Sequence, residues 1–183
     1  HTTEARGVEG STPSIPISMK NVKIREVKKK SLLVSKCADL VREYSWGKDY
    51  PVNPMKELKK ANYVIAAFYE KTLVGCASVS RGISPDKLNN EKLWIGHAVV
   101  LPKFRDRGIF TLLYEKQIVY GRKNKEDLYS CTDNPIVKRF LLKNGWTFLR
   151  NTKDELGGKC KVFVLSENIY KSKTAISNIK DGR

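Results

Sequence analysis

A strand-like apolar run that ends in a basic turn is the part of this sequence best suited to chemistry. The run is Val99-Val100-Leu101, the turn is Pro102-Lys103-Phe104-Arg105-Asp106-Arg107-Gly108, and a helical pattern opens at Ile109-Phe110. A helix that begins directly after such a turn presents unpaired backbone N–H groups and the positive end of its dipole, and both attract phosphate. At Gly108 the absence of a side chain lets the backbone approach a bound group closely. The sequence therefore predicts a phosphate-binding turn between a strand and a helix.

A second segment, residues 134–146, predicts a short capped helix. Asp133 or Asn134 can serve as the N-cap, with Pro135 in the first turn. Gly145 can take the left-handed conformation that ends a helix before an aromatic residue starts the next strand. The apolar face of this helix consists of Ile136, Val137, Phe140 and Leu141.

Together the two segments resemble the GNAT superfamily of acyl-CoA N-acyltransferases. The first is similar to its coenzyme A signature, V-x-P-x-x-R-x-x-G-x-G/A, through Val100, Pro102, Arg105 and Gly108. It departs from the signature at Phe110, where the family has a small residue. The second resembles the family's N-x-x-A-x-x-F-Y-E-K-x-G-F run. The resemblance implies a mixed α+β fold with a mostly antiparallel central sheet, splayed central strands and flanking helices.

The resemblance also implies a substrate and a site. Acetyl-CoA or another acyl-CoA would be the co-substrate, without a metal, and its pantetheine arm would bond to the backbone of the central strand. The residues implied to bind it are Val99, Val100, Arg105, Asp106, Arg107, Gly108, Ile109, Phe110 and Asn134. The implied reaction moves an acetyl or other short acyl group directly to an amine in a ternary complex, without a covalent acyl-cysteine.

The acid that protonates the leaving thiolate is not obvious from the sequence. Family members often use a tyrosine in the helix after the asparagine, and the matching position here is Leu141, which cannot donate a proton. The alternatives are Tyr129, Ser130 and Cys131 on the adjoining predicted strand, or a bound water.

His97 is the candidate general base, because it lies on the predicted central strand and histidine titrates near neutral pH. The competing interpretation is a structural histidine packed against the sheet. Glu91 and Asp133 also bracket the predicted site, although each suits a turn or a cap equally well. An ordered water that accepts the proton is a further alternative.

Hydrophobic periodicity predicts alternating strands and helices around these segments. The predicted strands are 22–27, 63–69, 73–80, 93–100, 128–131, 146–149 and 161–165. The predicted helices are 31–44, 55–60, 109–120 and the capped segment that Gly145 closes. The second and third strands form a hairpin, and the last two form an antiparallel pair. The 46–55 loop and the polar connection 81–90 are expected to hold the acceptor.

Length and composition fit one domain. The chain has 183 residues, 40% of them hydrophobic, with no apolar run long enough to span a membrane and no secretory leader. Residues 1–18 are expected to be a flexible extension or a cloning remnant, 19–165 the acyltransferase domain, and 166–183 a basic flexible tail. The four cysteines, Cys37, Cys76, Cys131 and Cys160, lack zinc-site spacing, so reduced thiols in a cytoplasmic protein are expected.

The charge limits the acceptor. Thirty-five Lys and Arg against nineteen Asp and Glu give a net charge of +16, which repels polycations and attracts nucleic acids and acidic metabolites. Basic clusters lie at 28–30, 56–60, 122–125 and 138–139. An amine carried on an acidic scaffold such as tRNA is therefore a candidate acceptor, and a solvated basic face is the plain alternative.

The sequence leaves an alternative function, an alternative fold and the oligomeric state to consider. A non-catalytic module of this fold could bind nucleic acid or a protein through its basic surface. An unrelated α/β nucleotide-binding domain is disfavoured, because the sequence has no Walker lysine pattern and no G-x-G-x-x-G after the first strand. Both a monomer and a homodimer fit the sequence.

Overall fold

The computed structural model describes residues 19–46, 49–88, 90–154 and 156–168. The expected N-terminal extension, 1–18, and the expected tail beyond residue 168 lie outside the described residues. The proposed boundaries of the domain, 19–165, stay a prediction.

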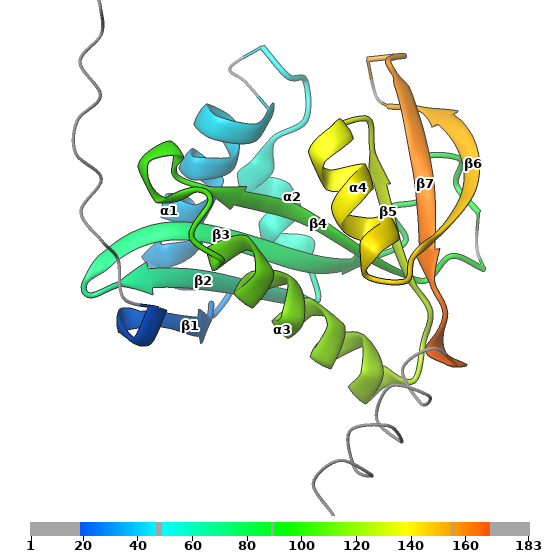
Figure 1. Cartoon of the computed structure of the whole chain (residues 1–183). Helices are drawn as coiled ribbons and strands as arrows, with labels where there is room; N and C mark the ends of the chain where they lie inside the picture. Colours follow the sequence, from blue (N-terminus) through cyan, green and yellow to red (C-terminus); the bar gives the residue numbers. More distant parts are fainter. Residues whose placement is uncertain (1–18, 47–48, 89, 155, 169–183) are drawn as a thin grey trace, which may run out of the picture.

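One seven-stranded sheet organises the chain (Figure 1). Its strands are β1 (Val22–Glu26), β2 (Tyr63–Tyr69), β3 (Thr72–Arg81), β4 (Leu93–Val100), β5 (Leu128–Thr132), β6 (Thr147–Lys153) and β7 (Lys159–Leu165). Their order is β1-β2-β3-β4-β5-β7-β6. Among the described strands, each neighbouring pair is antiparallel except β4 and β5, which are parallel. The predicted mixed, mostly antiparallel sheet is confirmed.

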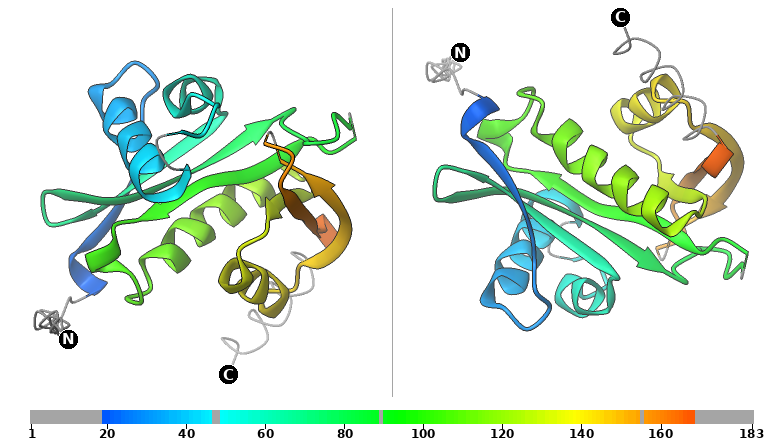
Figure 2. Two further views of the ribbon diagram at one scale, coloured as in Figure 1. Left: turned by 90° about the horizontal axis from the view of Figure 1, so that it is seen from above. Right: turned by 90° about the horizontal axis from the view of Figure 1, so that it is seen from below.

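Helices cover both faces of this sheet. In the described ranges they are α1 (Leu32–Val41), α2 (Pro54–Lys60), α3 (Ile109–Asn124) and α4 (Pro135–Lys143), with the shorter turns η1 (Met19–Asn21), η2 (Arg42–Trp46) and η3 (Pro102–Phe104). Figure 2 shows α1 and α2 on one face of the sheet and α3 and α4 on the other. None of the described helices is long and apolar enough to cross a membrane.

Both faces of the central strands are buried, which explains why β2 and β3 are almost continuously apolar instead of alternating. On the α1 and α2 face, Val34, Val41 and Leu58 pack with Val64 and Val99. The opposite face has two clusters of its own. One includes Ile65, Ala77, Val100, Ile109 and Leu113, and the other includes Leu93, Tyr114, Leu128, Leu141 and Phe163.

A glycine on α3 allows the helix to lie close to β5. A Cβ atom added at Gly121 would meet Leu128 Cδ1 at 2.6 Å. Helix α3 is longer than its apolar pattern predicts, because it continues through the charged residues 122–124 and ends where Lys125 is left-handed, at φ 53°. The helix thus packs along β2, β3 and β4 and reaches β5 at Leu128.

Most predicted elements are confirmed to within two residues, but the last hairpin is longer than expected. Strands β6 and β7 continue pairing to Thr152↔Cys160 and Lys153↔Lys159. The outer strand carries many exposed polar side chains, so its sequence shows little of the apolar period that marks a buried strand.

Candidate functional site

The two central strands part after a short contact. Strand β4 pairs with β5 only at Leu93↔Leu128 and Trp94↔Tyr129 in the described residues. Farther along, β4 stays with β3 to Val100, while β5 stays with β7 to Thr132. This divergence confirms the expected splay, and it leaves one edge of β4 without a strand partner.

His97 lies at a β-bulge in the open part of β4. Two residues, His97 and Ala98, stand opposite the single residue Ala77 of β3, and His97 has a left-handed φ of 51°. Its Nδ1 atom is 2.6 Å from Ser78 Oγ, and Ser78 is fully buried. A bulge re-aims the side chain at its centre. Ser78 Oγ thus holds the His97 ring at Nδ1, in the part of β4 that no longer pairs with β5.

A buried glutamine supports this bulge from below. Gln117 on α3 donates from Nε2 to the carbonyl oxygen of Ser78 at 2.7 Å and to that of Gly96 at 3.4 Å. Sequence reasoning missed both Ser78 and Gln117. A polar residue on the apolar stripe of α3 is the signal that points to Gln117, whereas a serine in a β-strand carries no such signal.

The predicted phosphate-binding turn follows β4 directly. Leu101 precedes the η3 turn, Asp106 is left-handed at φ 58°, and Gly108 at φ 75° is the N-cap of α3. No side chain caps the N-terminus of α3, so the first N–H groups of the helix lack the side-chain acceptor that a polar N-cap would supply. The backbone here has the form that anion binding requires.

Arg105 holds this turn in place. Its Nε donates to the carbonyl oxygen of Val100 at 3.0 Å, and its Nη2 donates to that of Tyr44 in η2 at 3.5 Å. The signature arginine thus joins the end of β4 to the helix layer on the α1 face.

Phe110, where the family has a small residue, packs against α4. Its ring contacts that of Phe140 edge-on at 5.0 Å, and Phe140 in turn meets Tyr114 at 4.9 Å. The larger side chain therefore fills space between α3 and α4.

Helix α4 begins and ends as predicted, and Asn134 is the N-cap. Its Oδ1 accepts from the N–H groups of Ile136 and Val137 at 2.9 and 3.3 Å. Gly145 is left-handed at φ 86°. Leu141, which the resemblance matches to the family's tyrosine, is buried in the core.

Tyr129 is buried and lies where β4 and β5 part. It pairs with Trp94 in the last parallel step, and the two rings lie 5.5 Å apart. Burial raises the pKa of the Tyr129 phenol, and the negative charges of Asp127 and Glu91 raise it further. The phenol therefore stays protonated at neutral pH and can act as an acid.

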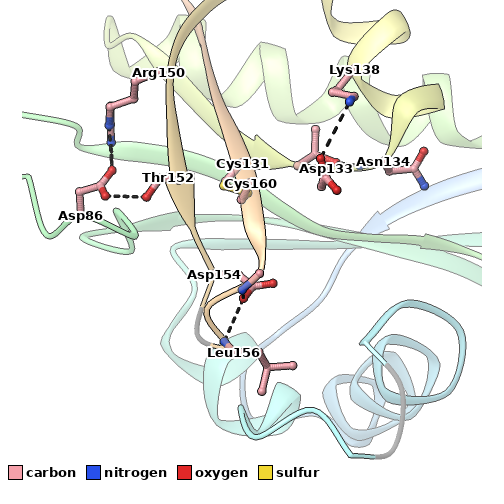
Figure 3. Close-up of a disulfide and its surroundings, with 12 residues drawn as sticks. Asp86, Cys131, Asp133, Asn134, Lys138, Arg150, Thr152, Asp154, Leu156 and Cys160 are labelled. Atoms are coloured by element: carbon pink, nitrogen blue, oxygen red, sulfur yellow. Dashed lines mark hydrogen bonds and ion pairs between the residues drawn. A yellow bond between two sulfur atoms is a disulfide. The ribbon is translucent and has the colours of Figure 1, made fainter.

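Cys131 is bonded to Cys160 (Figure 3), so the expectation that all four cysteines are reduced thiols is wrong for this pair. Their Cα atoms are 6.3 Å apart, because Cys131 pairs with Val162 and Cys160 lies two residues away along β7. While this bond is intact, Cys131 has no thiol proton to donate. Cys37 and Cys76 are free and buried.

Glu91 and Asp133, the weaker candidate bases, have different surroundings. Glu91 is buried and accepts from both terminal nitrogens of Arg150, at 2.9 Å for the Nη2–Oε2 contact, and from Ser84 Oγ at 2.7 Å. Arg150 also donates from Nε to Asp86 at 2.8 Å (Figure 3). These contacts fasten the connection between β3 and β4 to β6.

Asp133, by contrast, is exposed and lies 3.9 Å from Lys138 (Figure 3). Within the described residues, no cluster of three or more His, Cys, Asp or Glu side chains is placed to hold a metal ion.

The mixed sheet with diverging central strands is the fold that the resemblance implies, and a family comparison agrees with it. Residues 33–146 match the family described as "Acetyltransferase (GNAT) family". The match covers more than half of the chain, so the chain belongs to the GNAT acetyltransferase family. No curated protein matches the chain significantly.

Solved structures of this fold superpose well at low sequence identity. An aminoglycoside 6'-N-acetyltransferase complexed with coenzyme A is 14% identical, with 79% of this chain and 97% of that chain covered and a TM-score of 0.62. The acetyltransferase yncA of Salmonella typhimurium, solved with acetyl-CoA, is 16% identical, with 80% and 94% covered and a TM-score of 0.63. Naa50 of Arabidopsis thaliana, in complex with a bisubstrate analogue, is 19% identical, with 80% and 99% covered and a TM-score of 0.61. The superpositions show a shared fold, and identities this low show nothing beyond it.

Proposed function

We propose that this protein is an N-acetyltransferase that moves an acetyl or other short acyl group from acyl-CoA to an amine. One observation carries the proposal. Strand β4 stops pairing with β5 after Trp94, so its edge on that side is open to Val100. The turn that ends at the left-handed Gly108 follows this open edge. Membership of the family supports acetyl transfer as the reaction type.

The residues of the open edge suit an extended acyl-pantetheine arm. The peptide groups of Val99 and Val100 would bond to it as a further strand bonds to a sheet edge. The backbone N–H groups from Asp106 to Phe110 and the positive end of the α3 dipole would hold the pyrophosphate. Arg105 positions the turn through Val100, and Asn134 positions α4 through its cap.

The proposed chemistry is direct transfer. The amine nitrogen attacks the thioester carbonyl carbon, the C–N bond forms, and the C–S bond breaks. His97, held by Ser78, takes the proton from the amine, and Tyr129 gives a proton to the departing thiolate. The Cys131–Cys160 bond supports this route, because a bonded sulfur cannot carry an acyl group.

Acetyl-CoA titration and turnover measurements with a panel of amines test the proposal. Binding of acetyl-CoA by calorimetry, together with release of coenzyme A thiol on adding an amine, would support it. Binding without turnover on any amine would favour a non-catalytic module instead. No binding would overturn the acyltransferase assignment of this site.

Replacing His97 with asparagine should lower kcat by about a hundredfold. Asparagine tolerates the left-handed backbone of the bulge but cannot accept a proton, so the variant isolates the chemistry from the conformation. The measurement is kcat and KM for both proteins with the same amine. A kcat of the variant within about twofold of the wild type would contradict the role of His97.

Replacing Tyr129 with phenylalanine should lower kcat by about tenfold or more while the affinity for acetyl-CoA stays within about twofold. Because the pKa of Tyr129 is raised, the acid form persists, and the alkaline limb of kcat should lie above pH ~10, the ordinary pKa of a phenol. Tyr114→Phe is the matched control: it removes another buried hydroxyl, which accepts from Trp146 Nε1 at 2.8 Å. Equal kcat values for the two variants would argue against Tyr129 as the acid.

A further inference from the structure

An open, basic cavity lies between the N-terminal end of α1 and helix α2. Its volume is about 570 Å³. Its lining residues are Lys29, Lys30, Ser31, Leu32, Ser35, Met55 and Lys59. The lining contains three ammonium groups, two hydroxyl groups and no carboxylate. Ser31 Oγ already donates to the carbonyl oxygen of Lys28 at 2.7 Å, so the three ammonium groups and the Ser35 hydroxyl are the donors that suit phosphate oxygens.

The lysines of this cavity are not neutralised within the described part of the chain. Lys29, Lys30 and Lys59 form no ion pair with any described carboxylate, whereas Lys60 is paired with Glu57 at 3.3 Å. The adjoining Lys28 and Lys56 are exposed and add to the field. Uncompensated positive charge concentrated at one site attracts a polyanion and releases its counterions on binding.

Apolar surface in the same cavity narrows the class of ligand. Leu32 is 85% exposed beside these lysines, and Met55 is partly buried at the cavity wall. Inorganic phosphate has no apolar surface with which to cover these two side chains. An unpaired nucleobase has a flat face next to its own phosphate, so a single-stranded nucleic acid can place its phosphates near the lysines and a base against the aliphatic side chains of Leu32 and Met55.

The cavity is separated from the proposed acyl-CoA site by the length of a helix. Helix α1 and η2 run from Leu32 to Trp46, a path of roughly 20 Å at the rise of a helix. Arg105 of the phosphate-binding turn reaches Tyr44 near the far end of this path. The cavity is therefore separate from the phosphate-binding turn, and only a ligand much longer than an inorganic phosphate could extend from one to the other.

We propose that this α1–α2 cavity binds the backbone and an unpaired base of a single-stranded RNA segment that carries the acceptor amine. The identity of the acceptor rests on the proposed function, whereas RNA binding at the cavity does not require catalysis. The substrate class is thus an RNA-borne primary amine, and the cavity is a docking site distinct from the acyl-CoA site.

The test measures fluorescence anisotropy of a labelled single-stranded RNA of about 12 nucleotides. The cavity variant is Lys29→Glu/Lys30→Glu/Lys59→Glu. It should bind the RNA at least about tenfold more weakly than the wild type. The slope of log K against log salt should also be shallower by about 2, because each lost phosphate contact removes about 0.7 from it. The matched control is Lys116→Glu/Lys123→Glu/Lys143→Glu, an equal charge change at exposed lysines of α3 and α4 on the opposite face (Figure 2). Its affinity should change by less than about threefold.

A third variant, Leu32→Ser, separates base contact from charge. It should weaken binding of single-stranded RNA and leave the binding of an RNA duplex, whose bases are stacked inside, unchanged. Equal losses in the two charge variants would overturn the proposal in favour of a general field. Competition by polyglutamate as effective as that by RNA would overturn it in favour of an acidic peptide.

Acetyl-CoA titration of the same variants distinguishes this proposal from the proposed function. The cavity variant should bind acetyl-CoA like the wild type, since the two places share no residue. If the cavity variant binds both acetyl-CoA and RNA like the wild type, the docking-site proposal is wrong and the proposed function is unaffected. If the wild type does not bind acetyl-CoA, the proposed function is wrong, and RNA binding at the cavity is unaffected by that result.

Discussion

Replacing Gly108 with valine should lower the affinity for acetyl-CoA by about a hundredfold. Gly108 has φ 75° and is the residue from which α3 starts. A β-branched residue is a strong outlier in this region, so the turn must change its backbone and move the N–H groups that face the pyrophosphate. A loss near 3 kcal/mol of binding free energy corresponds to that factor. Calorimetric titration of the wild type and the variant gives the ratio directly.

Gly157 provides a control for the backbone conformation itself. It also has a positive φ, 78°, and a Cβ atom there would meet nothing within 4 Å. Gly157→Val should therefore cost similar stability, measured as a shift in Tm, without altering acetyl-CoA affinity. Gly108→Ala, with a milder strain, should fall between wild type and Gly108→Val in affinity. An unaltered affinity in the folded Gly108→Val protein would remove this turn from the binding site.

Replacing Arg150 with methionine should lower the free energy of unfolding by about 3 kcal/mol. The change leaves the buried carboxylate of Glu91 with Ser84 as its remaining side-chain partner. Removing one member of a buried ion pair typically costs about 3–5 kcal/mol, and the lower end applies because the Arg150 side chain is 24% exposed. Urea unfolding at neutral pH measures the difference.

Arg81→Met is the comparison for an ion pair near solvent. Arg81 contacts Glu126 at 2.8 Å, and 40% of the Arg81 side chain is exposed. Its loss should cost less than about 1 kcal/mol. The double variant Glu91→Leu/Arg150→Met should recover much of the lost stability, because no unpaired charge stays buried. A loss for Arg150→Met no larger than that for Arg81→Met would show that the buried pair contributes little.

Local signals were sufficient to predict the elements around the site. The apolar run 93–100, the turn at Gly108 and the cap at Asn134 each depend on residues close together in sequence, and all three are present as strand, left-handed turn and capped helix. The match of Leu141 to the family's tyrosine came from the resemblance and stays a prediction.

Features that depend on strand register could not be predicted in this way. Cys131 and Cys160 approach each other only because β5 and β7 pair in one particular register, and Glu91 meets Arg150 across 59 residues of chain. The bulge at His97 arises from a mismatch between β3 and β4 and has no mark in the sequence of β4 alone.

The short parallel contact between β4 and β5 has a consequence for cooperative unfolding. The described sheet consists of two antiparallel groups, β1 to β4 and β5 with β7 and β6, whose ladder of hydrogen bonds meets at two residue positions. Such a seam lets the groups open as separate units, each with its own free energy of opening in native-state amide exchange. The amides of β5 and β7 should then exchange together, on a different scale from those of β2 and β3. An acyl-CoA molecule bonded along the open edge of β4 would stabilise the contact between the two groups of strands. Its binding would therefore slow amide exchange at residues far from those that it touches.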